Sequence, residues 1–308
     1  MPAKRRSSLP AQHAAYRSIV KRLESRHANS ERFLKPVIAS DGTKLHCEER
    51  GAGVPVVFVH ELAGSCRSFD PEVEAFHTRF RCIAFNARGY TPSDVPASDQ
   101  SYSQDIAASD IAAVLNGLGI ERTHLVGVSM GAASVLQFAL KEPQRVFSAT
   151  LVGIGSGSDD PELFRRTTQE AVGLIETRGM AAYAEHTWAN PNRFRLKDKN
   201  PAEFQRSIEE ISAMAPLGRA NTMRGVQIRR PTLYAHEKRL ASLHVPVLVV
   251  VGDEDAGCRK PSEFLERTLP DARLRVMPGT GHAVNLEEPA EFNRLCLAFM
   301  DEALVASR

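Results

Sequence analysis

The chain has 308 residues, of which 43% are hydrophobic and 25% charged, and its formal net charge is +2. This composition is typical of a globular protein with one large domain or two small ones, and it excludes collagen-like, disulfide-scaffold and mostly disordered chains. The longest wholly apolar run, residues 245–251, is too short to cross a bilayer, and the near-neutral charge argues against a nucleic-acid binder.

Basic residues are concentrated at the N-terminus. Residues 1–35 contain nine Lys/Arg and two Asp/Glu, and apolar residues at helical spacing predict a basic N-terminal helical extension there. No apolar segment of a secretory signal follows the early basic residues, and the five cysteines are scattered without a CxxC pair. We therefore expect a cytoplasmic protein with reduced thiols and no structural zinc.

Apolar strands alternate with amphipathic helices from residue 36 onward. The expected order is a hairpin (37–40 and 44–48), strand 55–60, helix 71–80, strand 81–85, helix 106–118, strand 124–128, helix 130–140 and strand 149–153. After helices at 161–177 and 201–213, alternation resumes with strand 245–251, helix 261–269, strand 273–277 and helix 289–304. The pattern predicts an α/β core (36–154 and 241–308), a mostly parallel central sheet with helices on both faces, and an inserted helical cap (155–240).

A G-x-S-x-G pentapeptide lies where a predicted strand gives way to a helix. It reads Gly127-Val-Ser129-Met-Gly131. A serine on such a turn has its hydroxyl exposed, and the flanking glycines let the strand and the helix approach each other closely. The position of the motif favours Ser129 as a catalytic nucleophile over a structural turn serine.

An acidic cluster and a histidine follow two later strands. Asp253, Glu254 and Asp255 come after strand 245–251, and His282 comes after strand 273–277. Because the carboxyl ends of parallel strands meet at one edge of a sheet, we expect these residues to lie near Ser129. A serine hydroxyl needs a base to take its proton, and the base needs a carboxylate to orient it.

These motifs together resemble the α/β-hydrolase fold superfamily, in its capped serine hydrolase or esterase type, over about residues 36–308. The chain order of serine, acid and histidine is the order of that family. The resemblance implies that Asp255 is the acid, with Asp253 and Glu254 as surface or loop-capping residues, and that His282 is the base. It also implies that His60 supports neighbouring loops and does not catalyse.

The same resemblance implies an oxyanion hole formed by the backbone N–H groups of Leu62 and Met130. Glu61 stands where the resembling families usually have glycine. We expect its carboxylate either to point away and pair with a base such as Arg88, or to contact a polar or cationic part of the substrate. In the cap, Trp188 is a candidate to line the substrate pocket, although packing is the commoner role of such residues.

The predicted function is a serine hydrolase that cleaves a small to medium ester, lactone, thioester or activated amide through an acyl-enzyme on Ser129. It implies a small-molecule substrate, no cofactor and no metal, and it is compatible with a homodimer. A hydrolase-fold ligand receptor with slow or no turnover is one alternative. A carbon–carbon bond hydrolase of ring-cleavage products is another, since these share serine followed by Met-Gly, although their glycine-rich oxyanion loop is absent here.

Overall fold

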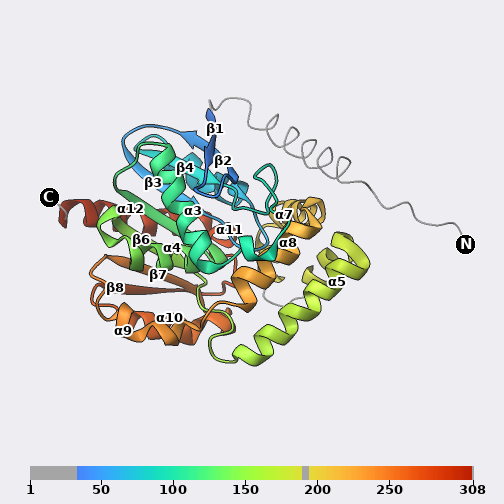
Figure 1. The fold of residues 1–308 in the computed structure, drawn as a ribbon. Helices are drawn as coiled ribbons and strands as arrows, with labels where there is room; N and C mark the ends of the chain where they lie inside the picture. The colour runs from blue at the N-terminus through green and yellow to red at the C-terminus, as the bar shows by residue number, and fades with distance from the viewer. Residues whose placement is uncertain (1–32, 189–193, 307–308) are drawn as a thin grey trace, which may run out of the picture.

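The structure is a computed structural model that describes residues 33–188 and 194–306, built around one eight-stranded sheet (Figure 1). The strands are β1 (Phe33–Ile38), β2 (Lys44–Arg50), β3 (Val54–Val59), β4 (Phe80–Phe85), β5 (Thr123–Val128), β6 (Val146–Val152), β7 (Val247–Gly252) and β8 (Ala272–Met277). They lie in the order β1-β2-β4-β3-β5-β6-β7-β8. The β1–β2 and β2–β4 pairs are antiparallel and all other neighbours are parallel. The predicted α/β fold class is therefore confirmed.

Helices cover both faces of this sheet and form the cap. In the core they are η1 (Cys66–Phe69), α2 (Asp70–Phe76), η2 (Asp99–Ser101), α3 (Gln104–Gly117), α4 (Met130–Lys141), η3 (Pro143–Arg145), η6 (Leu233–His236), α9 (Glu237–Leu240), α10 (Ala256–Thr268), α11 (Val284–Glu287) and α12 (Pro289–Ala306). Between β6 and β7 the cap contains α5 (Pro161–Trp188), α6 (Phe194–Lys199), α7 (Pro201–Ala213), α8 (Pro216–Thr222) and the π-helical turn η5 (Met223–Ile228). In Figure 1, α5, α7 and α8 lie to the right of the sheet. No helix in the described ranges is long and apolar enough to span a membrane.

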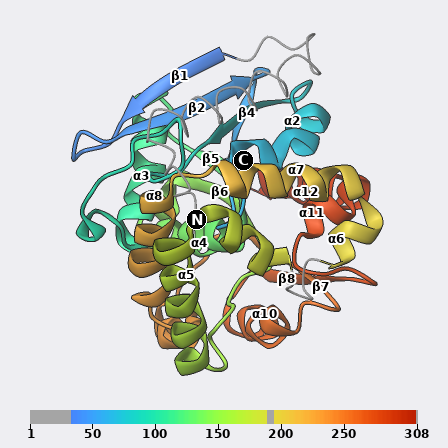
Figure 2. The same cartoon turned by 90° about the vertical axis from the view of Figure 1, so that its right-hand side faces the viewer.

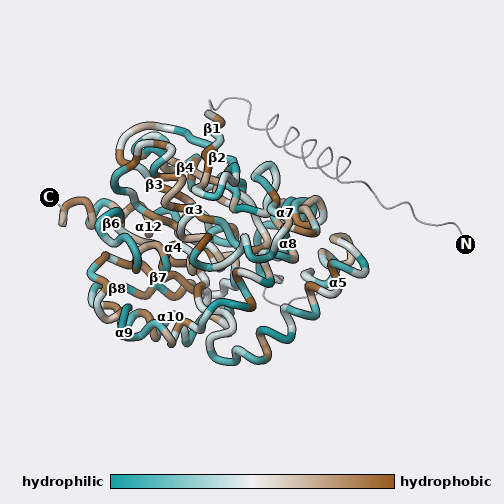
Figure 3. The backbone as a smooth tube through the Cα atoms, viewed as in Figure 1, coloured by the Kyte–Doolittle hydropathy of each residue, from teal (hydrophilic) through white to brown (hydrophobic). Residues whose placement is uncertain are grey.

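Two apolar layers sandwich the central strands. In β3, Val57 and Val59 belong to the layer under α3, α4 and α10, whereas Val56 and Phe58 belong to the layer under α2 and α12. Successive side chains of a strand point to opposite faces, so a strand buried on both faces is apolar at nearly every position. Figure 3 shows this pattern as brown strands inside and a largely teal α5 outside.

The structure corrects several predicted boundaries. Residues 33–35, counted with the N-terminal extension, are part of β1, where they pair with Cys47–Glu49 of β2; the rest of that extension, 1–32, lies outside the described residues. The helix predicted to reach residue 80 ends at Phe76, because Phe80 already pairs with Val54 as the first residue of β4. Helix α5 continues past residue 177 through a kink at Gly179, whose φ is +81°.

Candidate active site

Ser129 lies on a strained turn between β5 and α4. Its φ of 53° and ψ of −108° make it the one non-glycine residue with positive φ in the described ranges. A Cβ on Gly131 would lie 1.9 Å from the carbonyl oxygen of Val59, and one on Gly127 would lie 2.6 Å from Gly131. Only glycine therefore lets β5, β3 and α4 approach this closely, which is the physical reason for the pentapeptide.

Asp255 and His282 are in direct contact. The Nδ1 atom of His282 lies 2.7 Å from Oδ2 of Asp255, which is 1% exposed and follows the end of β7. Helix α10 begins directly after Asp255, at Ala256, and not at Pro261, where the predicted helix 261–269 begins. The predicted pairing of the histidine with the fourth residue of the Gly252–Asp255 segment is thus present in the structure.

The nucleophile candidate lies at the same edge of the sheet as this pair. The N–H of Ser129 donates to the carbonyl of Val152 at the end of β6, over 2.7 Å. The next residue, Gly153, lies against the histidine, since a Cβ on Gly153 would be 3.1 Å from Cε1 of His282. In the described part of the chain, no hydrogen bond joins the Ser129 hydroxyl to His282.

Burial and the neighbouring charge act in opposite directions on His282. Burial alone lowers the pKa of an imidazole, but the charge of Asp255 and its hydrogen bond raise the pKa of His282 well above its usual value. For the Asp255 carboxyl the signs are reversed: burial raises its pKa, but the charge of His282 and the hydrogen bond to it lower the pKa by more, so that the pKa of Asp255 lies below its usual value. Asp255 therefore stays ionised and fixes the orientation of the imidazole.

The two other acids of the cluster have partners other than the histidine. Asp253 accepts a hydrogen bond from the N–H of Thr280, 3.1 Å away, and Glu254 forms an exposed ion pair with Arg195. Asp253 thus lies in contact with the loop before His282, and Glu254 lies at the surface.

Two neighbours of the Asp255–His282 pair were not predicted as site residues. The buried Glu287 carboxylate accepts the N–H groups of Gly281 and Ala283, at 2.6 and 3.1 Å, and so holds both sides of His282. The Sγ atom of Cys258 lies 3.9 Å from Nδ1 of His282 and donates to the carbonyl of Gly153. The carboxylate of Asp255, the thiol of Cys258 and the imidazole of His282 lie within 4.8 Å of one another, a spacing that could hold a metal ion. The facing atoms of Asp255 and His282, however, are already hydrogen-bonded to each other.

The loop after β3 carries the predicted second oxyanion donor. The N–H of Ala87 donates to Nε2 of His60, at 3.0 Å, so Nδ1 carries the proton and donates to the carbonyl of Glu61, at 2.7 Å. His60 thus joins two loops, as its expected supporting role requires. The hydroxyl of Tyr90 donates to the carbonyl of Leu62, 2.9 Å away, and lies 3.9 Å from the sulfur of Met130.

The expected ion pair between Glu61 and Arg88 is wrong. Arg88 is held by Asp110 and Asp41, each at 2.7 Å. Glu61 instead accepts a hydrogen bond from the hydroxyl of Ser68, 2.9 Å away, and its other carboxylate oxygen is buried without a partner. Asp110 lies on α3 and Asp41 in the turn between β1 and β2, so this pairing joins distant segments and residue types alone do not specify it.

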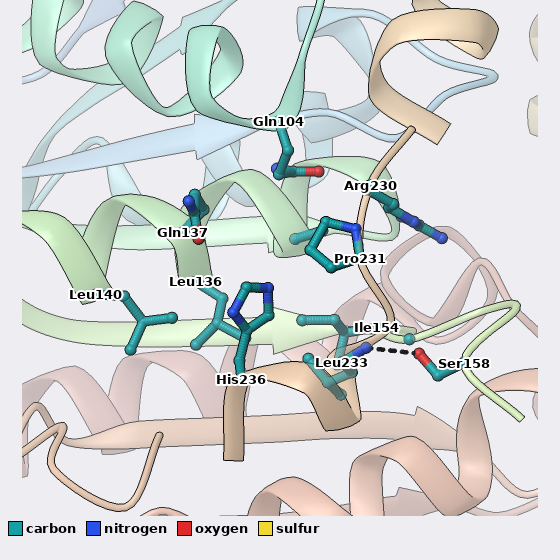
Figure 4. A pocket seen from close by; sticks show the side chains of 12 residues that line it. Gln104, Leu136, Gln137, Leu140, Ile154, Ser158, Arg230, Pro231, Leu233 and His236 are labelled. Atoms are coloured by element: carbon teal, nitrogen blue, oxygen red, sulfur yellow. Dashed lines mark hydrogen bonds between the residues drawn. The ribbon is translucent and has the colours of Figure 1, made fainter. Parts of the chain in front are cut away.

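The cap packs directly on this loop. One apolar cluster joins Tyr183 of α5, Met214 and Met223 to Met130, with Leu62 packed against it. Trp188 is the last residue of α5, and its side chain lies outside the described residues. The pocket in Figure 4 is a different one, between α3, α4 and the segment 230–236, and its lining includes none of Ser129, Asp255 and His282.

Known proteins similar to this chain share its fold and most of its length. The family model described as alpha/beta hydrolase fold matches residues 54–289. A 2-hydroxy-6-oxononadienedioate/2-hydroxy-6-oxononatrienedioate hydrolase from Burkholderia vietnamiensis is 29% identical, covering 85% of this chain and 93% of that protein. The 3-oxoadipate enol-lactonase 1 of Acinetobacter baylyi is 25% identical, covering 80% and 88%. The solved structure of a thermophilic esterase from Thermogutta terrifontis has a TM-score of 0.77 and 25% identity, covering 89% and 99%. The chain therefore belongs to the alpha/beta hydrolase fold family of enzymes.

Proposed function

We propose that this protein is a serine hydrolase that cleaves a small to medium ester, with lactones, thioesters and activated amides as related substrates. The observation that carries the proposal is the 2.7 Å contact of His282 with Asp255, at the same edge of the sheet as a serine held at positive φ after β5. The three named relatives, a lactonase, an esterase and a carbon–carbon hydrolase, support hydrolysis at a carbonyl carbon.

In the proposed reaction, Ser129 is the nucleophile. As its oxygen bonds to the carbonyl carbon, its proton passes to Nε2 of His282, while Asp255 holds the proton on Nδ1. The carbonyl oxygen becomes an oxyanion that accepts hydrogen bonds from the N–H groups of Leu62 and Met130. When the tetrahedral intermediate collapses, the bond to the leaving alcohol breaks and His282 gives that alcohol the proton.

Release of the acyl group repeats these steps with water. His282 takes a proton from a water molecule as its oxygen bonds to the acyl carbon, and then returns the proton to Ser129 as the acid leaves. By analogy with a serine protease, each of the two N–H donors to the oxyanion should stabilise the transition state by about 3 kcal/mol. No group beyond the chain's own residues and water is used in this sequence.

Hydrolysis of 4-nitrophenyl acetate and butyrate tests the proposal. Ser129→Ala and His282→Ala should each lower kcat by at least about 10³-fold, because the residues of such a unit act together. Ser109→Ala is the matched control, since Ser109 is exposed on α3 and bonds only to its own helix. Wild-type activity that survives in Ser129→Ala would contradict the proposal.

Carbon–carbon bond hydrolysis is the second candidate, favoured by the Burkholderia vietnamiensis relative and by the shared Ser129-Met130-Gly131 sequence. Here the bond that breaks would join the attacked carbonyl carbon to a carbon atom. Hydrolysis of a 2-hydroxy-6-oxo-dienoate, measured as the loss of the visible absorbance of this compound, distinguishes carbon–carbon bond hydrolysis from ester hydrolysis. A kcat/KM on this compound well above that on every ester in a chain-length series would make it the function.

A further inference from the structure

A buried arginine in the cap has no carboxylate partner. Arg219 of α8 is 1% exposed, and its guanidinium donates from Nη2 to the hydroxyl of Tyr183, at 2.7 Å, and from Nη1 to that of Tyr90, at 3.4 Å. The guanidinium also lies 4.9 Å from the centre of the Tyr183 ring. Its Nε atom is buried with no partner. Helices α5 and α8, which carry Tyr183 and Arg219, lie side by side in Figures 1 and 2.

The other buried arginines are paired differently. Across the ranges that the structure describes, Arg67 and Arg88 are the remaining arginines more than nine-tenths buried. Arg67 lies 3.0 Å from the carboxylate of Glu48, and Arg88 lies 2.7 Å from that of Asp110. No carboxylate of the described chain forms such a pair with Arg219, so its buried charge is only partly compensated by neutral hydroxyls and a ring.

The Tyr90 hydroxyl does not supply the missing negative charge. Burial raises the pKa of Tyr90 further above its usual range, so that its hydroxyl stays protonated at neutral pH. Glu61 is close enough for its charge to act on Arg219, but it is held by Ser68 and lies beyond ion-pair distance. An anion brought by a ligand would therefore complete the charge balance at Arg219.

Arg219 is also next to the proposed catalytic machinery. The Tyr90 hydroxyl that Arg219 contacts donates to the carbonyl of Leu62 and touches Met130, the two residues expected to provide the oxyanion donors. A single side chain thus separates the guanidinium from the oxyanion loop.

We propose that Arg219, assisted by the hydroxyl of Tyr183, binds a carboxylate carried by the substrate, so that the substrates are half-esters or lactones of dicarboxylic acids. The unpartnered Nε and the adjacent Nη2 form the edge of the guanidinium that accepts a carboxylate through two parallel hydrogen bonds. This inference rests on the proposed function and specifies its substrate class.

Two matched esters test the inference by activity. Mono-4-nitrophenyl glutarate carries a carboxylate, and 4-nitrophenyl pentanoate has a methyl group in its place. Wild type should favour the glutarate by about 10-fold or more in kcat/KM. Arg219→Met should remove most of that preference, because it should lower kcat/KM for the glutarate by at least about 5-fold more than kcat/KM for the pentanoate. Arg219→Lys keeps the positive charge but lacks the planar guanidinium, so its preference for the glutarate should lie between those of wild type and Arg219→Met.

Binding to the Ser129→Ala protein gives a readout that needs no turnover. Calorimetry with monomethyl glutarate should give a Kd about 10-fold or more below that of methyl pentanoate, and Ser129→Ala/Arg219→Met should lose this difference. Tyr183→Phe, which removes one hydroxyl, should weaken glutarate binding less than Arg219→Met does. Glu61→Gln removes a negative charge near Arg219 and should therefore strengthen the binding of monomethyl glutarate.

The outcomes separate the two proposals. Equal losses by Arg219→Met on both esters, with no difference in binding, would mean that Arg219 only positions the oxyanion loop through Tyr90, and would overturn the inference. Ester hydrolysis by wild type without preference for the carboxylate would also overturn it and leave the proposed function intact. Absent hydrolysis combined with carboxylate-selective binding through Arg219 would retain the subsite and reject the serine hydrolase.

Discussion

Replacing Gly131 by alanine should disrupt the contact on which the nucleophile turn depends. The added Cβ would lie 1.9 Å from the carbonyl oxygen of Val59, 2.5 Å from its carbonyl carbon and 2.8 Å from the carbonyl oxygen of His60. Such contacts essentially never fall below 3.0 Å, so α4 and β3 would have to separate by about 1 Å. All three atoms belong to the backbone, so a change of side-chain rotamer cannot relieve the clash.

The cost of this separation can be estimated from overpacking in other proteins. Forcing extra atoms into a packed interior costs about 1–3 kcal/mol, or more where backbone must move, and the helix gains about 1 kcal/mol from replacing glycine with alanine. We expect Gly131→Ala to lower the free energy of unfolding by about 2 kcal/mol or more. Since Ser129 and the Leu62 loop would both shift by a fraction of 1 Å, kcat/KM should fall by about 10²-fold.

Gly173→Ala is the matched control, because Gly173 is also a helical glycine and nothing lies within 4 Å of a Cβ placed there. This substitution should stabilise the protein by about 0.5–1 kcal/mol through helix propensity alone, and leave activity unchanged. Urea unfolding followed by circular dichroism, with ester hydrolysis in parallel, measures both variants. Equal unfolding midpoints and equal activities for the two variants would refute the described packing of α4 on β3.

Three more substitutions follow from the site and the core. Ser129→Gly should be about 1 kcal/mol more stable than Ser129→Ala in urea unfolding, because both lack the hydroxyl and only glycine is free of the strain at φ 53°. Asp255→Asn should lower kcat by about 10⁴-fold. It should also shift the acidic limb of the kcat/KM–pH profile to lower pH, because the pKa of His282 falls when burial acts without the negative charge of Asp255. An acidic limb at the wild-type pH would contradict this. Arg88→Met should cost about 3–5 kcal/mol of unfolding free energy, since the buried Asp110 loses its partner, and a loss below about 1 kcal/mol would show that the pair is not buried as described.

The sheet and the positions of Ser129, Asp255 and His282 could be predicted because each depends on local sequence. A strand buried on both faces is an apolar run, and a chain of such runs with helices between them leaves few arrangements. The residues that follow strand ends then meet at one edge. Asp255 and His282 lie in contact for this reason.

Other features depend on pairings between distant segments, which single-sequence patterns do not contain. His124 is buried within β5, where its Nδ1 atom is hydrogen-bonded to the hydroxyl of Ser148 on β6. The role of Tyr90 depends on Leu62, 28 residues away, and on Arg219, 129 residues away. An arginine in a charged, helix-rich segment looks like a surface residue, and only the fold shows that this one is buried.

Intact mass after treatment with a small fluorophosphonate tests the central claim most directly, because covalent capture requires an activated serine but not the right substrate. Wild type should gain one adduct, Ser129→Ala should gain none, and Asp255→Asn should label much more slowly. An adduct of equal yield on Ser129→Ala, or no adduct on a folded wild-type protein, would contradict the assignment of Ser129 as the nucleophile activated by His282 and Asp255.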